Sequence, residues 1–313
     1  MLDGVSLDQL RTFIAAADAG SFSAAGRRLG RAQSVVSQTL ANLEGQLGVR
    51  LFERGGRFPV LTAEGKALLT DARAVAGSMD LFKARARGLA GGLEPEVSLV
   101  VDVMFPTEVL TTSVAAFYVE FPNTPLRISA EFMSAVLEQV LDRRCAFGIR
   151  GPLPISRPEL SNEHLLILHY QWVASPKHPL GAKPGPTRSE ELSRHVQLVL
   201  SDRSHLSDGM DLGVFSPRTW RLFDLGAKHA FLRAGLGWGG MPHHVIKEDL
   251  ASGVLVPLTI EATDAVTRME MSTTYRTDSP PGPAGRWLIN RLTYTAERMS
   301  NAAFECAQGR SGR

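Results

Sequence analysis

Cysteine is scarce in this chain, and its scarcity excludes several kinds of site. The 313 residues hold two cysteines, Cys145 and Cys306, which lie far apart and form no CxxC pair. Neither a zinc site of paired cysteines nor a disulfide framework is therefore expected. Two interpretations of Cys145 stay open. It is either a small buried apolar side chain, which is the favoured reading, or a redox-active thiol.

Long apolar stretches and the commonest catalytic motifs are also missing. No run of 18 or more apolar residues occurs, so no membrane span is expected. The N-terminus has no basic region followed by an apolar stretch, which argues against a secretory signal and favours the cytoplasm. Neither a GxSxG nucleophile elbow nor a phosphate-binding P-loop appears. We therefore expect no enzyme activity.

Two short motifs that suggest chemistry are discounted. The run Gly235-Leu-Gly237-Trp-Gly-Gly240 matches the dinucleotide pattern GxGxxG, but that pattern must follow a strand and open a helix. Here it follows an expected helix and precedes Met-Pro, so we expect a tight helix-to-strand turn. His243 and His244 are adjacent, which places them poorly for one metal ion. We therefore expect neither a cofactor nor a bound metal ion.

The charge that is present is unevenly distributed. The net charge is +2 overall, but residues 1–92 carry +4 and residues 93–313 carry −2. Within 27–57 there are six arginines against Glu44 and Glu53. A positive block of this kind suits a surface that faces DNA phosphates. A solvated basic face without a nucleic-acid role stays the alternative.

Three helices and a hairpin are expected in the first 61 residues. Apolar residues recur at three- and four-residue steps over 7–18, 22–29 and 33–47, and Gly20, Gly30 and Gly48 end these segments. Ser21 is the expected N-cap of the second helix. Two short extended runs within 49–61 flank Gly55-Gly56, which is typical of a hairpin. The order is helix, helix, tight turn, helix, hairpin.

The start of the third helix carries side chains suited to reading DNA. In a helix-turn-helix the first turns of the second motif helix enter the major groove, where glutamine can bond adenine at two atoms. The polar side chains at the start of this helix, from Gln33 to Gln38, project away from the core positions Leu40 and Leu43. Ordinary helix capping is the alternative. Hairpin arginines can pair with phosphates or enter the minor groove. The candidate DNA-binding residues are Arg31, Gln33, Ser34, Ser37, Gln38, Arg50, Arg54 and Arg57.

A long helix is expected over about 62–90, with Thr62 as its N-cap. Apolar residues along it step by four and three, which is the seam of a coiled coil and predicts a dimer. Packing of the helix on its own domain is the alternative. Gly91-Gly92 follows as a hinge. The seam residues are Leu68, Ala72, Val75, Met79, Phe82, Ala86 and Leu89.

From residue 95 onward the pattern alternates between strands and helices, which favours parallel α/β units. About 170 residues of this kind suffice for two lobes with a cleft between them. The C-terminal tail, residues 308–313, is expected to be disordered. Strands are expected at 97–101, 126–130, 145–149, 165–174, 196–200, 221–224 and 267–275, a turn at 237–242, and helices at 107–119, 134–143, 226–235 and 282–300.

Residues 7–66 resemble the LysR family of transcriptional regulators. The resemblance is carried by Leu7-Asp-Gln-Leu10-Arg-Thr-Phe13, Gly20-Ser-Phe-Ser-Ala-Ala25, Leu29-Gly-Arg-Ala-Gln33-Ser-Val-Val-Ser37, Leu43-Glu44, Leu47-Gly48-Val-Arg50-Leu-Phe52-Glu-Arg54 and Leu61-Thr62-Ala-Glu-Gly65. Ser175-Pro-Lys-His178-Pro179-Leu180, Gly235-Leu-Gly237 and Met241-Pro242 extend it more loosely along the chain. One departure is Ala32, where the family usually has a hydroxyl that would cap the helix or reach a phosphate.

The resemblance implies a fold of class α + α/β. We expect a winged helix-turn-helix at 1–61, a dimerising linker helix at 62–92, and a two-lobed α/β effector domain at 93–313 that resembles periplasmic binding proteins. Lobe I is expected at about 93–164 and 267–300, and lobe II at about 165–266. The implied partners are double-stranded DNA, a small-molecule effector, a second copy through the linker helix, commonly a tetramer, and RNA polymerase if the protein activates transcription.

The effector is expected in the cleft, near the C-terminal ends of strands and the starts of helices. Because Asp102 follows the first strand, an anion beside it would be disfavoured. The resulting hypothesis is a neutral, cationic or aromatic effector. The alternative is that Asp102 is an exposed cap and that the two residues Met104 and Phe105 are core. The candidate effector-binding residues are Asp102, Met104, Phe105, Thr107, Ser134, Asp202, Arg203 and Trp238.

Overall fold

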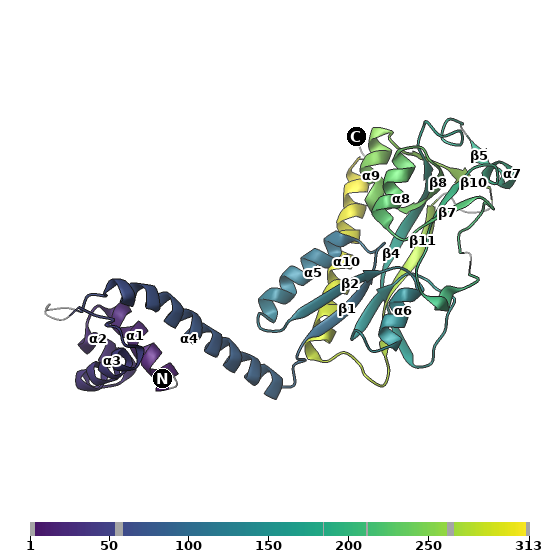
Figure 1. The fold of residues 1–313 in the computed structure, drawn as a ribbon. Coiled ribbons are helices and arrows are strands. Elements are labelled where there is room, and N and C mark those ends of the chain that lie inside the picture. Colours follow the sequence, from purple (N-terminus) through teal and green to yellow (C-terminus); the bar gives the residue numbers. More distant parts are fainter. Residues whose placement is uncertain (1–3, 54–58, 184, 211, 262–265, 311–313) are drawn as a thin grey trace. The chain divides into compact units, whose positions relative to one another are not determined.

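The computed structural model describes residues 4–53, 59–183, 185–210, 212–261 and 266–310. The chain divides into two compact units, Met1–Gly91 and Gly92–Arg313, each of which is described here by itself (Figure 1). Within the described residues, no helix is both long enough and apolar enough to cross a membrane.

The N-terminal unit is helical. Its elements are α1 (Leu7–Ala19), α2 (Phe22–Leu29), α3 (Gln33–Leu47) and α4 (Ala63–Ala90). Ser21 and Thr62 cap α2 and α4 as expected, because each side chain accepts a hydrogen bond from the backbone N–H three residues on. Gly20, Gly30 and Gly48 adopt the left-handed conformation at the helix ends, which only glycine adopts without cost. The three predicted helices are confirmed.

The structure describes the base of the predicted hairpin. Phe52 and Leu61 form an antiparallel bridge, and Glu53 donates its backbone N–H to the Val60 carbonyl over 2.8 Å. The turn at Gly55-Gly56 lies outside the described residues. The ring of Phe52 meets those of Phe13 and Phe22 edge-on, at centroid distances of 5.8 and 5.2 Å. These contacts hold the hairpin against α1 and α2.

The first half of α4 packs on its own unit, and the second half is exposed. Ala72, expected on the dimer seam, is buried in the core formed with α1 and α3, and Leu68 packs against that core. The Arg73 guanidinium lies 2.6 Å from the Asp18 carboxylate of α1. Further along, Val75, Phe82 and Leu89 are 52%, 67% and 47% exposed. At Ala72, therefore, the helix packs on its own domain, which was the alternative to a dimer seam.

The C-terminal unit is built on one mixed sheet, with the strand order β2-β1-β3-β11-β4-β8-β6-β7 and β9 added beside β4. β1, β2 and β3 are parallel, as are β6, β7 and β8, while β11 is antiparallel to β3 and β4, and β4 is antiparallel to β8. The main strands are β1 (Val97–Asp102), β2 (Leu126–Glu131), β3 (Phe147–Arg150), β4 (Leu160–Ala174), β6 (Gln197–Leu200), β7 (Thr219–Leu222), β8 (Trp238–Pro242), β9 (Val256–Pro257) and β11 (Val266–Arg276). A second, two-stranded sheet pairs β5 (Pro186–Thr187) with β10 (Thr259–Ile260).

Helices divide this unit into two lobes (Figure 1). The first lobe surrounds β1, β2 and β3 with α5 (Thr107–Glu120), α6 (Ser134–Leu141) and α10 (Pro283–Arg310), and it has the largest apolar core. The second surrounds β6, β7 and β8 with α8 (Leu225–Arg233) and α9 (His243–Ser252). The smaller elements are α7 (Ser189–Leu192) and the 3-10 helix η2 (His205–Ser207). The long strand β4 pairs with β11 and then with β8, which joins the lobes.

Four expectations about this unit need correction. The sheet is mixed rather than parallel, because β4 and β11 run antiparallel between the lobes. The segment expected as a turn at 237–242 is the buried strand β8, and α9 follows it directly. The strand expected at 221–224 lies earlier, at Thr219–Leu222. α10 continues to Arg310, so the disorder expected from residue 308 is wrong for 308–310, and residues 311–313 lie outside the description.

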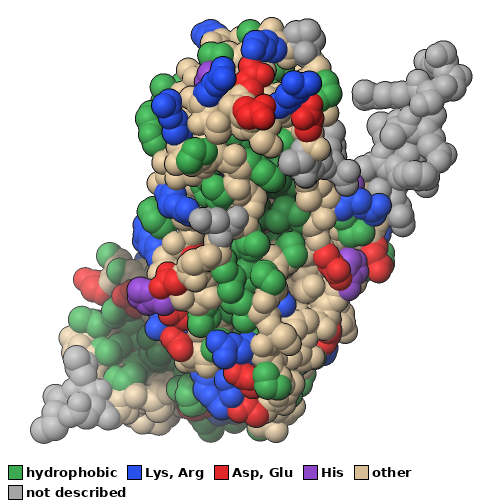
Figure 2. Space-filling view, turned by 90° about the vertical axis from the view of Figure 1, so that its right-hand side faces the viewer, with side chains coloured by type: hydrophobic (Ala, Val, Ile, Leu, Met, Phe, Trp, Pro, Cys, Tyr) green, Lys and Arg blue, Asp and Glu red, His purple; other side chains and the backbone are tan. Residues whose placement is uncertain are grey.

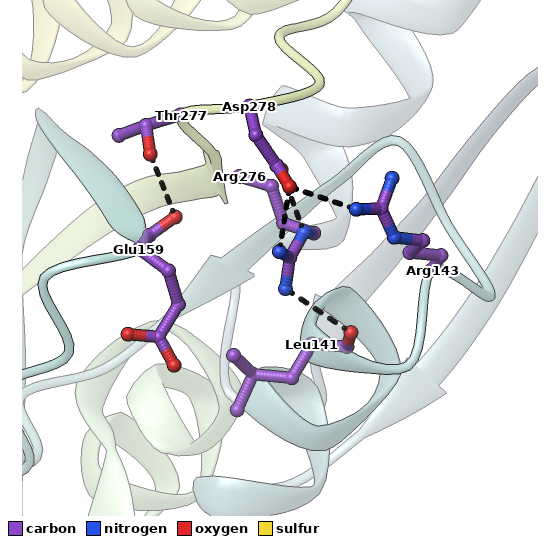
Figure 3. A network of polar contacts seen from close by, with 6 residues as sticks. All are labelled: Leu141, Arg143, Glu159, Arg276, Thr277 and Asp278. Carbon is purple, nitrogen blue, oxygen red and sulfur yellow. Dashed lines mark hydrogen bonds and ion pairs between the residues drawn. The ribbon is translucent and has the colours of Figure 1, made fainter.

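Ion pairs fasten the connection between β11 and α10 (Figure 3). Asp278 accepts hydrogen bonds from Arg276 at 2.8 Å and from Arg143 at 2.7 Å, and the Arg276 hydrogen bond is the main cause that lowers the pKa of this carboxyl. Arg276 also donates to the Leu141 carbonyl at the end of α6 over 3.4 Å. The network therefore ties α6 to the end of β11.

Candidate functional site

The first candidate site is the exposed face of α3. The side chains of Gln33, Ser34, Ser37 and Gln38 are all exposed, whereas Val36, Leu40 and Leu43 on the other face are buried in the core of the unit. Gln38 donates to Asn42 one turn later, over 2.9 Å. A helix that buries its apolar face and presents amides and hydroxyls on the other has the chemistry needed to contact base edges.

Arg31 is already oriented in the turn before α3. Its guanidinium makes two parallel hydrogen bonds to the Asp8 carboxylate of α1, at 2.6 and 2.7 Å. The Arg31 hydrogen bonds lower the pKa of Asp8, because they stabilise the carboxylate form. This fork holds the arginine against α1 at the edge of the α3 face.

The N-terminus of α3 lacks a side-chain cap. Ala32 is the N-cap residue and makes no side-chain hydrogen bond, and its carbonyl accepts from Val35 and Val36 as in any first turn. Within α3, the hydroxyl nearest in sequence to the missing cap is that of Ser34. Among the residues that the structure describes, no hydrogen bond involves the Ser34 side chain, so the cap is not replaced.

The hairpin supplies one described arginine. Arg50 is exposed at the base of the hairpin, where its carbonyl accepts a 2.7 Å hydrogen bond from the Thr62 hydroxyl. Glu44 of α3 accepts from the backbone N–H groups of Leu51 and Phe52, which fixes the hairpin beside the helix. Arg54 and Arg57, also predicted to contact DNA, lie outside the described residues.

The second candidate site is a cavity of about 730 Å³ in the C-terminal unit. The face drawn in Figure 2 is hollowed between the two lobes, and hydrophobic side chains gather in the hollow. Residues from both lobes and from the two joining strands line the cavity, among them Asp102, Met104, Phe132, Arg150, Tyr170, Trp172, Leu198, Lys228, Thr267 and Met269. Its size and its mostly apolar wall are typical of a small-molecule site.

Asp102 is buried in this wall, not exposed as one interpretation had it. It is 1% exposed, and its carboxylate accepts backbone hydrogen bonds from Met104 at 2.9 Å and from Met133 at 3.2 Å. Burial raises the pKa of Asp102 to about 6, although these hydrogen bonds oppose the rise. The carboxylate holds the turn after β1 and the turn before α6 together.

Lys228 and Tyr170 provide a second polar group, which sequence analysis missed. Lys228 lies in α8, is 2% exposed, and its amine donates to the Tyr170 hydroxyl of β4 over 3.4 Å. Burial lowers the pKa of Lys228 to about 7 and raises that of Tyr170. The only sequence signal was the spacing of Lys228 and Leu232, which share the buried face of α8.

Of the eight effector-binding residues predicted, Asp102 and Met104 line the cavity. Asp202 lies in the wall of a smaller neighbouring cavity of about 370 Å³. Its carboxylate accepts from the backbone and hydroxyl of Ser134, at 2.9 and 2.5 Å, and so joins the lobes at the start of α6. Ser134 and Asp202 do not line the large cavity, and neither do the other four: Phe105 is core, Thr107 and Arg203 are exposed, and Trp238 is fully buried against Trp172.

Packing explains the glycine run that matches the dinucleotide pattern. A Cβ at Gly237 would lie 2.6 Å from the Val196 carbonyl oxygen, one at Gly239 would lie 2.7 Å from that of Leu198, and one at Gly240 would lie 2.0 Å from the Tyr170 ring. The glycines therefore let β8 approach β6 and β4. Gly239 and Gly240 belong to the strand β8 and Gly237 directly precedes it, so the run does not form a loop between a strand and a helix.

The structure answers the question about Cys145. It is 8% exposed in an apolar cluster with Val100, Val136 and Val140. Burial raises the pKa of its thiol to about 12, and a thiol in that state is a poor nucleophile at neutral pH. The interpretation as a small buried apolar side chain is therefore favoured over that of a redox-active thiol.

Comparisons with known proteins agree along the whole chain. Residues 7–66 match the family described as "Bacterial regulatory helix-turn-helix protein, lysR family", and residues 90–297 match the "LysR substrate binding domain". The HTH-type transcriptional regulator AceR of Acinetobacter baumannii is 29% identical, over 92% of this chain and 96% of its own length. The regulator YhaJ of Escherichia coli K12, named as probable, is 27% identical over the same shares.

Solved structures show the same fold. An OxyR mutant of Corynebacterium glutamicum superposes with a TM-score of 0.59 at 22% identity, covering 96% of each chain. A second OxyR mutant of the same species, bound to hydrogen peroxide, gives a TM-score of 0.53 at 22% identity, covering 96% of this chain and 97% of its own. At this identity the likeness concerns the fold alone.

Together these findings define a DNA-binding transcriptional regulator with an effector-binding domain, and not an enzyme. The chain belongs to the LysR family. The resemblance that residues 7–66 carried in the sequence is confirmed, as is the fold class it implied.

Proposed function

We propose that α3 reads base edges in the major groove of the operator while the surrounding arginines contact phosphates. Gln33, Ser34, Ser37 and Gln38 are the proposed base-contacting residues. The proposed backbone-contacting residues are Arg31, Arg50, Arg54 and Arg57. The observation that carries the proposal is the free polar face of α3: in the described part of the chain, no hydrogen bond engages the side chains of Gln33, Ser34 or Ser37.

Two matched substitutions test this division of roles. Gln33→Ala should relax the preference at one base pair by about 1–3 kcal/mol, because it removes a base contact. Arg54→Ala should weaken binding to all sequences alike and should make it less dependent on salt, because one phosphate contact is lost. Fluorescence anisotropy on operator and single-mismatch duplexes separates these effects. Indistinguishable specificity profiles for the two variants would contradict the assignment.

We further propose that the large cavity is the effector site and that the domains run as expected, over 1–61, 62–92 and 93–313. The two lobes, with boundaries near 164 and 267, would change their relative position when the cavity is filled. The size and lining of the cavity support this proposal. A cavity of about 730 Å³ takes a molecule of two or three rings, and its wall combines apolar side chains with a few polar groups.

The proposed assembly is a homodimer through α4, paired into a tetramer. The exposure of Val75, Phe82 and Leu89 supports it, because apolar side chains at heptad spacing on one helix face need a partner. The protein would act in the cytoplasm, where its DNA is, and would contact RNA polymerase if it activates transcription.

A further inference from the structure

Lys228 is a buried cation for which the structure offers no counter-ion. Its amine has one hydrogen-bond partner among the described residues, the neutral Tyr170 hydroxyl, and no described carboxylate pairs with it. Buried charges in proteins are ordinarily paired, because an uncompensated charge away from water is costly. This position of the cavity wall would therefore gain from an anion.

Asp102 is not the counter-ion of Lys228, although it lines the same cavity. Its carboxylate is committed to the backbone N–H groups of Met104 and Met133 and to the backbone of Gly151. It lies close enough to Tyr170 to help raise the pKa of that hydroxyl, yet burial alone accounts for the shift at Lys228. The acid and the amine are separate features of the wall.

Much of the wall is apolar, and two of its polar atoms have no partner among the described residues. Phe132, Met104, Met269 and Leu198 line it alongside Trp172. The indole N–H of Trp172 and the hydroxyl of Thr267 have no hydrogen-bond partner in the described part of the structure. Buried polar atoms without partners are uncommon in folded proteins, and both belong to residues that line the cavity. The wall therefore suits a ligand with a large apolar body and few polar groups.

We propose that the effector is an aromatic acid whose carboxylate binds between the Lys228 amine and the Tyr170 hydroxyl while its rings fill the apolar part of the cavity. This rests on the proposal that the cavity is the effector site. The carboxylate of this acid would supply the counter-ion that Lys228 lacks among the described residues. This ligand has the aromatic body that sequence analysis allowed, but its negative charge departs from that expectation, which took account of Asp102 and missed Lys228.

Binding of such an acid is coupled to a proton. An amine with a pKa of about 7 is only partly protonated at pH 7.5, and a bound carboxylate favours its charged form. The proton comes from solvent and goes to the Lys228 amine. The other titratable or charged side chains that line the cavity are Asp102, Arg150, Tyr170, Arg268 and Glu270.

The test uses the full-length protein and matched probes on three ring systems: benzoate, 2-naphthoate and biphenyl-4-carboxylate, each beside its primary amide and its methylamine. Tryptophan fluorescence measures affinity, because Trp172 lies in the cavity wall. Calorimetry in buffers of different ionisation enthalpy measures proton uptake at pH 7.5. We expect at least one acid to bind about 10-fold or more tightly than its amide, with uptake of part of a proton.

Two variants identify the amine. Lys228→Met should remove the advantage of the acid and the proton uptake while the amide binds as before. Lys177→Met, at an exposed lysine that does not line the cavity, should change neither. Equal affinity for acid and amide, or an acid preference that survives Lys228→Met, would overturn the assignment of charge but leave the cavity as a site. Failure of every probe to bind would overturn both, whereas operator binding measured alongside tests the DNA function separately.

Discussion

Replacing Lys228 by methionine should make the C-terminal unit more stable. Methionine has nearly the same length and no charge, so it fills the same space without a buried amine. Burial lowers the pKa of Lys228 from 10.5 to about 7. At about 1.4 kcal/mol per pKa unit, this corresponds to a cost of roughly 5 kcal/mol for keeping the amine charged in the folded state.

Two effects reduce the expected gain. The Tyr170 hydroxyl loses its contact with the amine, which costs about 1 kcal/mol. Rearrangement around the charge lowers the burial penalty further, so we expect a net gain of about 2–4 kcal/mol at pH 6. The gain depends on pH in a defined direction. The unfolded chain binds the extra proton between pH 7 and 10.5, so the wild-type penalty is complete below pH 7 and fades as the pH rises to 10.5.

Urea denaturation followed by tryptophan fluorescence measures this gain in the full-length protein. All four tryptophans, at positions 172, 220, 238 and 287, lie in the C-terminal unit, so the signal reports on that unit. Lys177→Met is the control and should change little, because its side chain is exposed. A Lys228→Met variant less stable than wild type at pH 6, or a stability difference that does not shrink by pH 9.5, would refute the reasoning.

Three further predictions concern other parts of the chain. Ala32→Ser should raise the stability of the N-terminal unit by about 1 kcal/mol, because it caps α3; circular dichroism checks this, and no gain would mean that the first turn is satisfied otherwise. Phe82→Glu should halve the mass of the proposed assembly in analytical ultracentrifugation, because a charge enters the exposed face of α4; an unchanged mass would remove α4 from the interface. Gly240→Ala should destabilise the C-terminal unit by about 1–3 kcal/mol, because its Cβ would lie 2.0 Å from the Tyr170 ring, whereas Gly77→Ala meets open space; equal effects would show that β8 can move away from β4.

The N-terminal unit was predictable because its signals are local. Terminal glycines and a 3.6-residue apolar period, together with the Ser21 cap of α2, defined α1, α2 and α3 to within one residue. The α4 seam was harder to predict, because its spacing does not reveal that Ala72 packs inside the unit while Phe82 stays exposed. That difference depends on how far α1 extends along α4, where Asp18 pairs with Arg73 and Arg11 with Asp80.

The C-terminal unit was less predictable because its sheet is made by contacts between distant segments. Nothing local to β8 shows that Trp238–Pro242 is a strand, since Gly239 and Gly240 are required by the Leu198 carbonyl and the Tyr170 ring, which are distant in sequence. The residues that line the cavity were equally hard to predict from local sequence. Asp102 was found because it ends a strand, but Lys228 on a helix reaches the cavity only through the pairing of β4 with β8.

Binding of the purified protein to duplex DNA from upstream of its own gene tests the central claim most directly. Fluorescence anisotropy would compare this duplex with a scrambled one across a salt series. The account predicts tight binding that prefers the native duplex and weakens as salt rises, because arginines displace counter-ions from the phosphates. Equal and feeble binding to both duplexes at low salt, followed by failure to enrich any sequence from a random pool, would contradict it.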